Sequence, residues 1–226
     1  MDPRLRAAVD ASVRWYDDVF AVHGIPAVVE DGVWSARGRP PRWHSAAKTI
    51  DPSASEPVLR AVEPFEHCSV ADSFGALDLS GAGFSVLFEA SWVHRPPSLV
   101  VAAAELPDAW SVVRDEGTLG RWNAAHDTLD VLVPSLLLDP RFVFLAQERG
   151  GDLAAGAVLH DPGGAAVELS NVWGREGAAV DPGPLLTCAA ALHPGRALVG
   201  YARGEELGSL VDAGFVGVGP QVVWVR

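Results

Sequence analysis

One glutamate within an apolar run is the strongest candidate for chemistry in this sequence. Glu168 stands between Val167 and Leu169 in the stretch AAVELSNVW, which runs from Ala165 to Trp173. On a buried strand face, its carboxylate could act as a general base, provided that burial raises its pKa towards neutrality. On the other face of an alternating strand, it would lie in solvent with its two neighbours turned inward. The residues alone leave both interpretations open.

Two further groups of polar residues offer weaker candidates. His126 stands beside Asp127 at the end of a predicted helix. It could act as a base, or it could simply interact favourably with the negative end of the helix dipole. His67 and Cys68 begin the polar run HCSVADS (67–73), and a Cys/His pair suggests a nucleophile. Adjacent residues on a strand point to opposite faces, however, so the cluster could instead line a pocket with His94 or His44. Helix caps and turns are the ordinary alternative. No metal site is predicted, because the run lacks recognisable metal-ligand spacing.

The turn residues around Glu168 predict the element that carries it. Three apolar runs at 142–147, 153–160 and 165–173 are separated by the turn sequences RGGD (149–152) and DPGG (161–164). Glycine tolerates positive φ and Pro-Gly fixes tight turns, so these runs are typical of strands joined by hairpins. The sequence therefore predicts an antiparallel meander of three strands.

The same reasoning predicts the remaining elements. Leu5, Val9, Val13, Tyr16 and Phe20 recur at spacings of three and four, which indicates a helix that Gly24 ends. The expected elements are a helix at 2–23, strands at 26–36 (with a turn at 31–32) and 43–50, a helix at 56–62, strands at 84–94 and 110–114, helices at 118–127 and 130–138, a helix from 182 or 184 to 192, a strand at 197–201, a helix at 204–213, and one or two strands within 215–226. The predicted fold class is α+β, with a mixed, mostly antiparallel sheet flanked by helices.

Composition limits the classes of partner. The chain has 226 residues, 49% of them hydrophobic, and a formal net charge of −12. An acidic chain is not expected to bind a nucleic-acid backbone or an anionic membrane, since both attract Lys/Arg patches. Lys48 is the only lysine, which we interpret as a composition bias. The two cysteines, Cys68 and Cys188, are far apart; we expect buried thiols in a reducing cytoplasm, with a disulfide left open. The charged N-terminus lacks a signal-peptide pattern, and no apolar run reaches the ~18 residues of a membrane span.

The element order after Pro97 resembles the GNAT superfamily of acyl-CoA-dependent N-acyltransferases. Residues 165–173 look like the fourth strand of that family, residues 197–201 like the fifth, and 205–215, ending in Asp-Ala-Gly-Phe, like the helix that precedes the last strand. The likeness divides the chain at Pro96-Pro97 into 1–97 and 98–226. It also suggests that the first part is a degenerate, partial copy of the same unit. In this family the fourth and fifth strands diverge, which would leave a slot for a thioester.

Two positions depart from the family pattern. The family holds the CoA diphosphate with backbone N–H groups after the fourth strand, but here Pro182 and Pro184 lack these donors and Glu176 and Asp181 would repel a diphosphate. A tyrosine that often serves the family as general acid is replaced by Leu210. These departures therefore weaken the prediction of the activity more than the prediction of the fold.

The resemblance implies a function and a set of residues. We expect transfer of an acetyl or other short acyl group from acyl-CoA to an amine of a small molecule; a catalytically silent domain that binds a ligand or a protein is the alternative. Homodimer formation is left open. The expected catalytic residues are Glu168, Tyr201 and His126, and the residues expected to bind acetyl-CoA are Leu169, Ser170, Asn171, Val172, Arg175 and Gly177.

Overall fold

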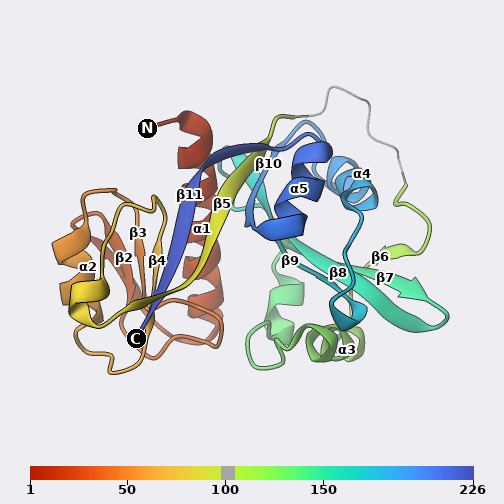
Figure 1. Ribbon diagram of the computed structural model, residues 1–226. Helices are drawn as coiled ribbons and strands as arrows, with labels where there is room; N and C mark the ends of the chain where they lie inside the picture. Colours follow the sequence, from red (N-terminus) through yellow and green to blue (C-terminus); the bar gives the residue numbers. More distant parts are fainter. Residues whose placement is uncertain (98–104) are drawn as a thin grey trace.

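The structure is a computed structural model that describes residues 1–97 and 105–226 (Figure 1). Among these residues, the α-helices are Pro3–Val22 (α1), Ser55–Val62 (α2), Glu116–His126 (α3), Pro182–Leu192 (α4) and Gly204–Asp212 (α5). Short 3₁₀ helices cover Ser80–Ala82, Pro134–Leu138 and Arg175–Gly177. The strands are Ala27–Glu30 (β1), Val33–Ala36 (β2), Ala47–Thr49 (β3), Ser69–Asp72 (β4), Ser85–Arg95 (β5), Trp110–Val112 (β6), Phe142–Arg149 (β7), Asp152–His160 (β8), Ala166–Gly174 (β9), Ala197–Ala202 (β10) and Val216–Val225 (β11).

The described strands form one mixed sheet, in the order β1-β2-β3-β4-β11-β5-β10-β9-β8-β7-β6. Neighbours pair antiparallel except for β3 with β4 and β9 with β10, which pair parallel. The predicted α+β class is confirmed, and so is the predicted meander, which is β7-β8-β9.

Two long strands connect the halves of the sheet. β5 pairs with β10 on one side and β11 on the other, and β11 continues the sheet to β4. Figure 1 shows β5 and β11 side by side between the two halves. The domain division at residue 97 and the N-terminal partial copy stay predictions, and residue 98, the start of the second part, lies outside the described residues.

The helices cover both faces of the sheet. On β5, Trp92 packs in the cluster that contains α1, whereas Val93 packs with Leu210 of α5 on the other face. On β2, Trp34 packs with α1, and Val33 packs with α2. α1 and α3 therefore lie on one face, and α2, α4 and α5 on the other, because successive side chains of a strand point in opposite directions.

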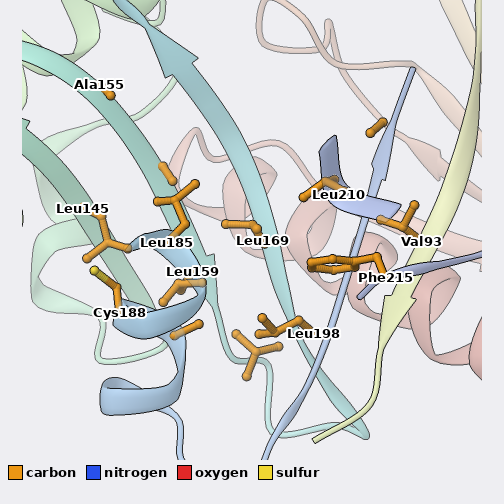
Figure 2. Close-up of a cluster of buried hydrophobic side chains, with 14 of the residues drawn as sticks. Val93, Leu145, Ala155, Leu159, Leu169, Leu185, Cys188, Leu198, Leu210 and Phe215 are labelled. Atoms are coloured by element: carbon orange, nitrogen blue, oxygen red, sulfur yellow. The ribbon is translucent and has the colours of Figure 1, made fainter. Parts of the chain in front are cut away.

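The core beneath α4 and α5 is a single apolar cluster. α4 places Leu185 and Cys188 against Leu145 of β7 and Leu159 of β8, and Phe215 closes the other end (Figure 2). All five side chains are at most 5% exposed. This apolar layer packs against the α4 and α5 face of β8 and β9. The polar groups of these strands lie on the opposite face, under α1.

The first helix forms for the reasons that its sequence suggested. The Asp2 side chain accepts a hydrogen bond from the Arg4 backbone N–H, Pro3 occupies the first turn, and Gly24 follows the helix with φ of 67°. The buried face is rotated from the predicted one, because Ser12 and Trp15 are buried, whereas the predicted Leu5 and Val13 are only half-buried. α1 thus presents a polar and an aromatic side chain to the sheet.

Two predicted elements differ from the structure, and the last segment takes the simpler of its two predicted forms. The strand expected at 43–50 is reduced to β3, because Trp43 has φ of 69°, which a strand cannot hold, so 37–46 forms a loop. The helix expected at 130–138 is the 3₁₀ helix Pro134–Leu138. The last segment is one strand, β11, with register shifts between Gly217 and Gly219 and between Val223 and Trp224.

None of the described helices combines the length and the hydropathy that a membrane span requires.

Candidate active site

Strands β9 and β10 run together only briefly. Three residue pairs join them, and the last of these pairs is Glu168 with Val199. Beyond it, β9 pairs with β8, and β10 pairs with β5. Gly200 begins this separation: a Cβ added there would lie 2.6 Å from the carbonyl oxygen of Leu169. The divergence predicted for these two strands is confirmed.

A cavity of about 800 Å³ adjoins the gap between β9 and β10. Its walls come from α1, the loop at 39–45, β3, the segment 67–69 at the start of β4, β5, the end of α3, β9, β10, α5 and β11. Segments before and after residue 97 therefore enclose it together. Side chains that could do chemistry or bind charge there include Ser12, Tyr16, Lys48, Glu168 and Tyr201.

Glu168 is buried at the end of the parallel ladder. It is 2% exposed, and among the described residues its Oε2 atom has no hydrogen-bond partner. Burial raises its pKa to about 7, against the opposing influence of His160 and Lys48. Acid and carboxylate forms then coexist near neutral pH, which suits a group that accepts and releases a proton. The alternative that Glu168 lies in solvent is wrong, because α1 covers this face of β9.

Lys48 brings a cation to the same cavity. It lies on β3, is 1% exposed, and donates a hydrogen bond of 3.0 Å from Nζ to the Ser12 hydroxyl. The ammonium also lies 4.9 Å from the ring centroid of Tyr16 and 5.1 Å from that of Trp92, distances at which cations are attracted to aromatic rings. Burial lowers its pKa to about 8, and the nearby Glu168 acts in the opposite direction.

A histidine on β8 connects Glu168 to the surface. The Nδ1 atom of His160 lies 4.0 Å from Oε2 of Glu168, and its Nε2 atom lies 2.9 Å from Oδ2 of Asp18 on α1. Both carboxylate oxygens of Asp18 accept hydrogen bonds of 2.8 Å from Arg141, whose side chain is 44% exposed. The chain of polar groups therefore runs from the buried carboxyl to a partly exposed ion pair.

Tyr201 lines the same cavity from β10, two residues after the Val199 that pairs with Glu168. It is 44% exposed, and its ring stacks on Phe88 with centroids 6.4 Å apart and meets Trp92 edge-on at 5.7 Å. Removal from bulk water raises the pKa of its phenol. Tyr201 therefore stays protonated at neutral pH. Leu210, at the position that the family often gives to tyrosine, also lines the cavity.

The predicted donor-binding residues of β9 follow Glu168 along the cavity wall. Leu169, Ser170, Asn171 and Val172 all line it. Asn171 has φ of 50° and sits where the β8–β9 register shifts, so a bulge turns the strand at this point. His126 lines the cavity as well, stacked on Trp173 with centroids 6.2 Å apart, and burial lowers its pKa. The structure brings these residues together with Glu168 and Tyr201.

Arg175 and Gly177 do not line the cavity. Arg175 forms an exposed ion pair with Asp152 at 3.0 Å, and Gly177 belongs to the 3₁₀ turn that follows β9. The structure therefore separates these two residues from the rest of the predicted site.

The backbone positions at the N-terminus of α4 either donate their N–H group within the helix cap or have no N–H group. Asp181 caps the helix, and its Oδ1 atom accepts a hydrogen bond of 2.9 Å from the Gly183 N–H. Pro182 and Pro184 have no N–H group. Of the three backbone positions that begin the helix, none is left to bind a diphosphate, and the cap adds a negative charge.

The polar run at 67–73 is divided between the cavity, which His67, Cys68 and Ser69 line, and a turn that Asp72 stabilises. Asp72 accepts hydrogen bonds from Thr49 Oγ1 at 3.4 Å and from the backbone N–H groups of Phe74 at 3.1 Å and Leu77 at 2.8 Å, which is the turn-stabilising role expected as the ordinary alternative. Cys68 and Cys188 are both free thiols, and burial raises the pKa of each. A raised pKa disfavours the thiolate, so the nucleophile interpretation of Cys68 has no support.

Across the described residues, no three His, Cys, Asp or Glu side chains are grouped in a way that could hold a metal ion.

Comparison with solved structures places this architecture among known folds. The chain superposes on a GCN5-related N-acetyltransferase from Kribbella flavida with a TM-score of 0.61, 14% identity, and coverage of 96% of this chain and 95% of that one. A putative GNAT-family acetyltransferase from Novosphingobium aromaticivorans superposes with a TM-score of 0.58 and 12% identity, and the match covers 88% of this chain and 89% of that one. A GCN5-related N-acetyltransferase-like protein from Streptococcus suis gives 0.56 and 15%, with full coverage of both chains.

The chain has the GNAT acyl-CoA N-acyltransferase fold. These likenesses extend over both parts of the chain, because the coverage reaches 88% or more. No protein-family model matches the sequence, and no curated protein does either. At such low identity the GNAT fold is shared, whereas the residues of the cavity have to be interpreted from their own geometry.

Sequence reasoning misses Lys48, which lines this GNAT-fold cavity, and the pair His160 and Asp18, which lies behind Glu168. In the sequence, Lys48 is interpreted as a composition bias. A lysine that stands alone among many arginines could instead indicate a position that requires an ammonium group. His160 and Asp18 stand 142 residues apart, and only the packing of α1 on β8 joins them. Nothing in their local sequence indicates that contact.

Proposed function

We propose that this protein transfers an acyl group from a thioester to an amine held in the cavity. The observation that carries the proposal is the position of Glu168, a buried carboxyl with a pKa of about 7 at the point where β9 and β10 separate. A thioester arm laid along β9 would place its carbonyl beside this carboxyl. The GNAT fold of the structural neighbours supports the same reaction class.

The residues of the cavity divide the work between them. Glu168 accepts a proton from the ammonium group, so that the neutral nitrogen attacks the thioester carbonyl. Backbone N–H groups of β9 near the bulge at Asn171 polarise that carbonyl. The leaving thiolate takes a proton, for which Tyr201 of β10 is the proposed donor. His160, held by its contact with Asp18, opposes the rise that burial causes in the pKa of Glu168.

Acetyl-CoA is the first donor to test, and the two parts of that molecule fit differently. The gap and the β9 wall suit a pantetheine arm. The self-capped N-terminus of α4 offers no N–H group to the diphosphate, so we propose that the donor is held mainly through its thioester arm.

The test is release of free thiol from acetyl-CoA or S-acetylpantetheine, measured with pools of small amines. Glu168→Gln should lower the rate by about 10²–10⁴-fold, the usual contribution of general acid–base catalysis. Glu116→Gln, an exposed carboxylate at the start of α3, is the matched control and should retain the wild-type rate. A fully active Glu168→Gln enzyme contradicts the assignment of the base.

The self-capped α4 favours a second candidate, a catalytically silent GNAT-fold domain that binds a small ligand. Calorimetry separates the two functions. Binding of an amine with no binding of either thioester donor supports the silent domain, whereas binding of both substrates with thiol release supports the transferase.

A further inference from the structure

Two buried groups of opposite charge face the same cavity from different parts of the chain. Lys48 comes from β3 and Glu168 from β9, and both are at most 2% exposed. No salt bridge within 4.0 Å joins them to each other, and among the described residues Lys48 forms no salt bridge at all. The fold thus brings a cation and a carboxyl to one enclosed space without pairing them directly.

Each group also has unused hydrogen-bonding capacity. An ammonium carries three N–H donors, and the observed hydrogen bond of Lys48 is the one to Ser12. The Oε2 atom of Glu168 has no partner among the described residues. Burying a charge without satisfying it is costly, and apolar residues of similar size are often equally stable or more so. Stability alone therefore does not account for this pair, whereas a ligand that bridges both groups does.

The surroundings of the pair indicate what such a ligand carries. Tyr16 and Trp92 flank the ammonium, and Tyr201 and Phe88 extend the aromatic wall along the cavity. These rings offer apolar contact to a side chain, but no anion. The two charged ends of a bridging ligand would have to match Lys48 and Glu168.

We propose that the acceptor is an amino carboxylate, such as a free α-amino acid, whose carboxylate pairs with Lys48 while its ammonium faces Glu168. The proposal deepens the proposed function and rests on it for the reacting group. The ammonium gives one proton to the Glu168 carboxylate, and the neutral nitrogen attacks the thioester carbonyl carbon. A C–N bond forms as the C–S bond breaks, the thiolate leaves and is protonated, and the amide nitrogen loses its second proton. The products are an N-acylamino acid and a free thiol.

Calorimetry without any thioester tests the binding step by itself. The twenty standard amino acids are titrated first, and the aromatic wall makes phenylalanine the reference probe. Phenethylamine, which lacks the carboxylate, and 3-phenylpropionate, which lacks the amine, are its matched analogues. A charge-assisted hydrogen bond contributes about 1.5–3 kcal/mol, so phenylalanine should bind roughly 10–100-fold more tightly than either analogue.

Two variants assign that preference to the named residues. Lys48→Met removes a buried charge and keeps the volume, so it should fold at least as well as the wild type. It should bring the affinities for phenylalanine and phenethylamine to within a few-fold of each other. Ser12→Ala, which removes only the hydroxyl partner of Lys48, should reduce the preference partially, and it provides the same test if Lys48→Met fails to fold.

The outcomes distinguish this inference from the proposed function. The inference is overturned if no amino acid binds at millimolar concentration, or if phenethylamine binds as tightly as phenylalanine. Amino-acid binding that depends on Lys48, without thiol release from any donor, supports the inference and removes the acyl transfer. Thiol release that proceeds equally well with amines lacking a carboxylate supports the transfer and removes the inference.

Discussion

The Nδ1 atom of His160 lies 4.0 Å from the Oε2 atom of Glu168, and neither atom has a hydrogen-bond partner among the described residues. The other ring nitrogen of His160 meets the Asp18 carboxylate, which favours a proton on that side. The imidazole ring therefore turns its Nδ1 atom towards Glu168. The influence of His160 lowers the pKa of Glu168 against the rise that burial causes.

Removing the charge of Asp18 should move the pH dependence of the reaction. In Asp18→Asn, His160 loses the carboxylate partner of its Nε2 atom, so its opposing influence on the pKa of Glu168 weakens. We expect the rising limb of the pH–rate profile to shift to higher pH by about 1 unit, as for the loss of one nearby charge. Asp139→Asn is the matched control, because Asp139 pairs with Arg141 at 2.6 Å without contacting His160 through a hydrogen bond. Equal shifts in both variants would exclude a specific role for Asp18.

The ionisation of Glu168 should also make the free energy of unfolding depend on pH. Its folded-state pKa of about 7 exceeds the ordinary 4.5, so the folded protein binds this proton more tightly than the unfolded chain does. The resulting stabilisation is fully present below pH 4.5 and is lost as the pH rises to about 7. Glu168→Gln cannot ionise, so the difference in unfolding free energy between variant and wild type should grow in favour of the variant across this window. Urea unfolding at several pH values measures it, and a difference that does not change with pH would contradict the buried, high-pKa assignment.

Local sequence is enough to predict the frame of the site. Turn residues such as Asp161-Pro162-Gly163-Gly164 predict the hairpins of the meander, and the helical spacing in the first 23 residues predicts α1. The divergence of β9 and β10 follows from the family resemblance. Most of the site's electrostatics cannot be predicted in this way, because they depend on which distant element covers each strand face. Glu168 is buried because α1, more than 140 residues earlier in the chain, packs on its side of β9.

Lys48 illustrates the same limit. The alternation of a strand tells which residues share a face, but it does not tell what lies across from that face. Lys48 reaches the cavity because β3 pairs parallel with β4 and β11 then joins β4 to β5. Only this long-range pairing brings the lysine to the cavity that Glu168 also lines.

Two glycines should respond in opposite ways to the same substitution. A Cβ at Gly200 would lie 2.6 Å from the Leu169 carbonyl oxygen, so Gly200→Ala has to push β9 and β10 apart at the start of their gap. We expect a loss of about 1–3 kcal/mol, as for overpacking, together with reduced thiol release. At Gly208, within α5, an added methyl group would meet nothing within 4 Å, so Gly208→Ala should gain about 0.5–1 kcal/mol and keep its activity. Thermal unfolding and the transfer assay check both, and an unimpaired Gly200→Ala protein would show that the gap tolerates a wider opening.

The N-terminus of α4 should make the protein indifferent to the nucleotide part of a CoA donor. Because Asp181 occupies the Gly183 N–H and two prolines remove the others, the diphosphate gains no hydrogen bond there. A charge-assisted bond contributes about 1.5–3 kcal/mol, or more than tenfold, so KM for acetyl-CoA and for S-acetylpantetheine should agree within about threefold. Asp181→Ala frees one N–H and removes one negative charge, so it should lower KM for acetyl-CoA alone, at a cost of about 1 kcal/mol for the lost cap.

Asp115→Ala is the matched control for Asp181→Ala, since Asp115 caps α3 through the Thr118 N–H at 2.9 Å. It should cost similar stability and leave the ratio of the two KM values unchanged, which separates loss of a cap from exposure of a diphosphate site. If the wild-type protein instead prefers acetyl-CoA to S-acetylpantetheine by tenfold or more, the nucleotide is bound elsewhere on the surface. The self-capped helix would then explain where CoA does not bind, and the donor could no longer be described as held through its thioester arm.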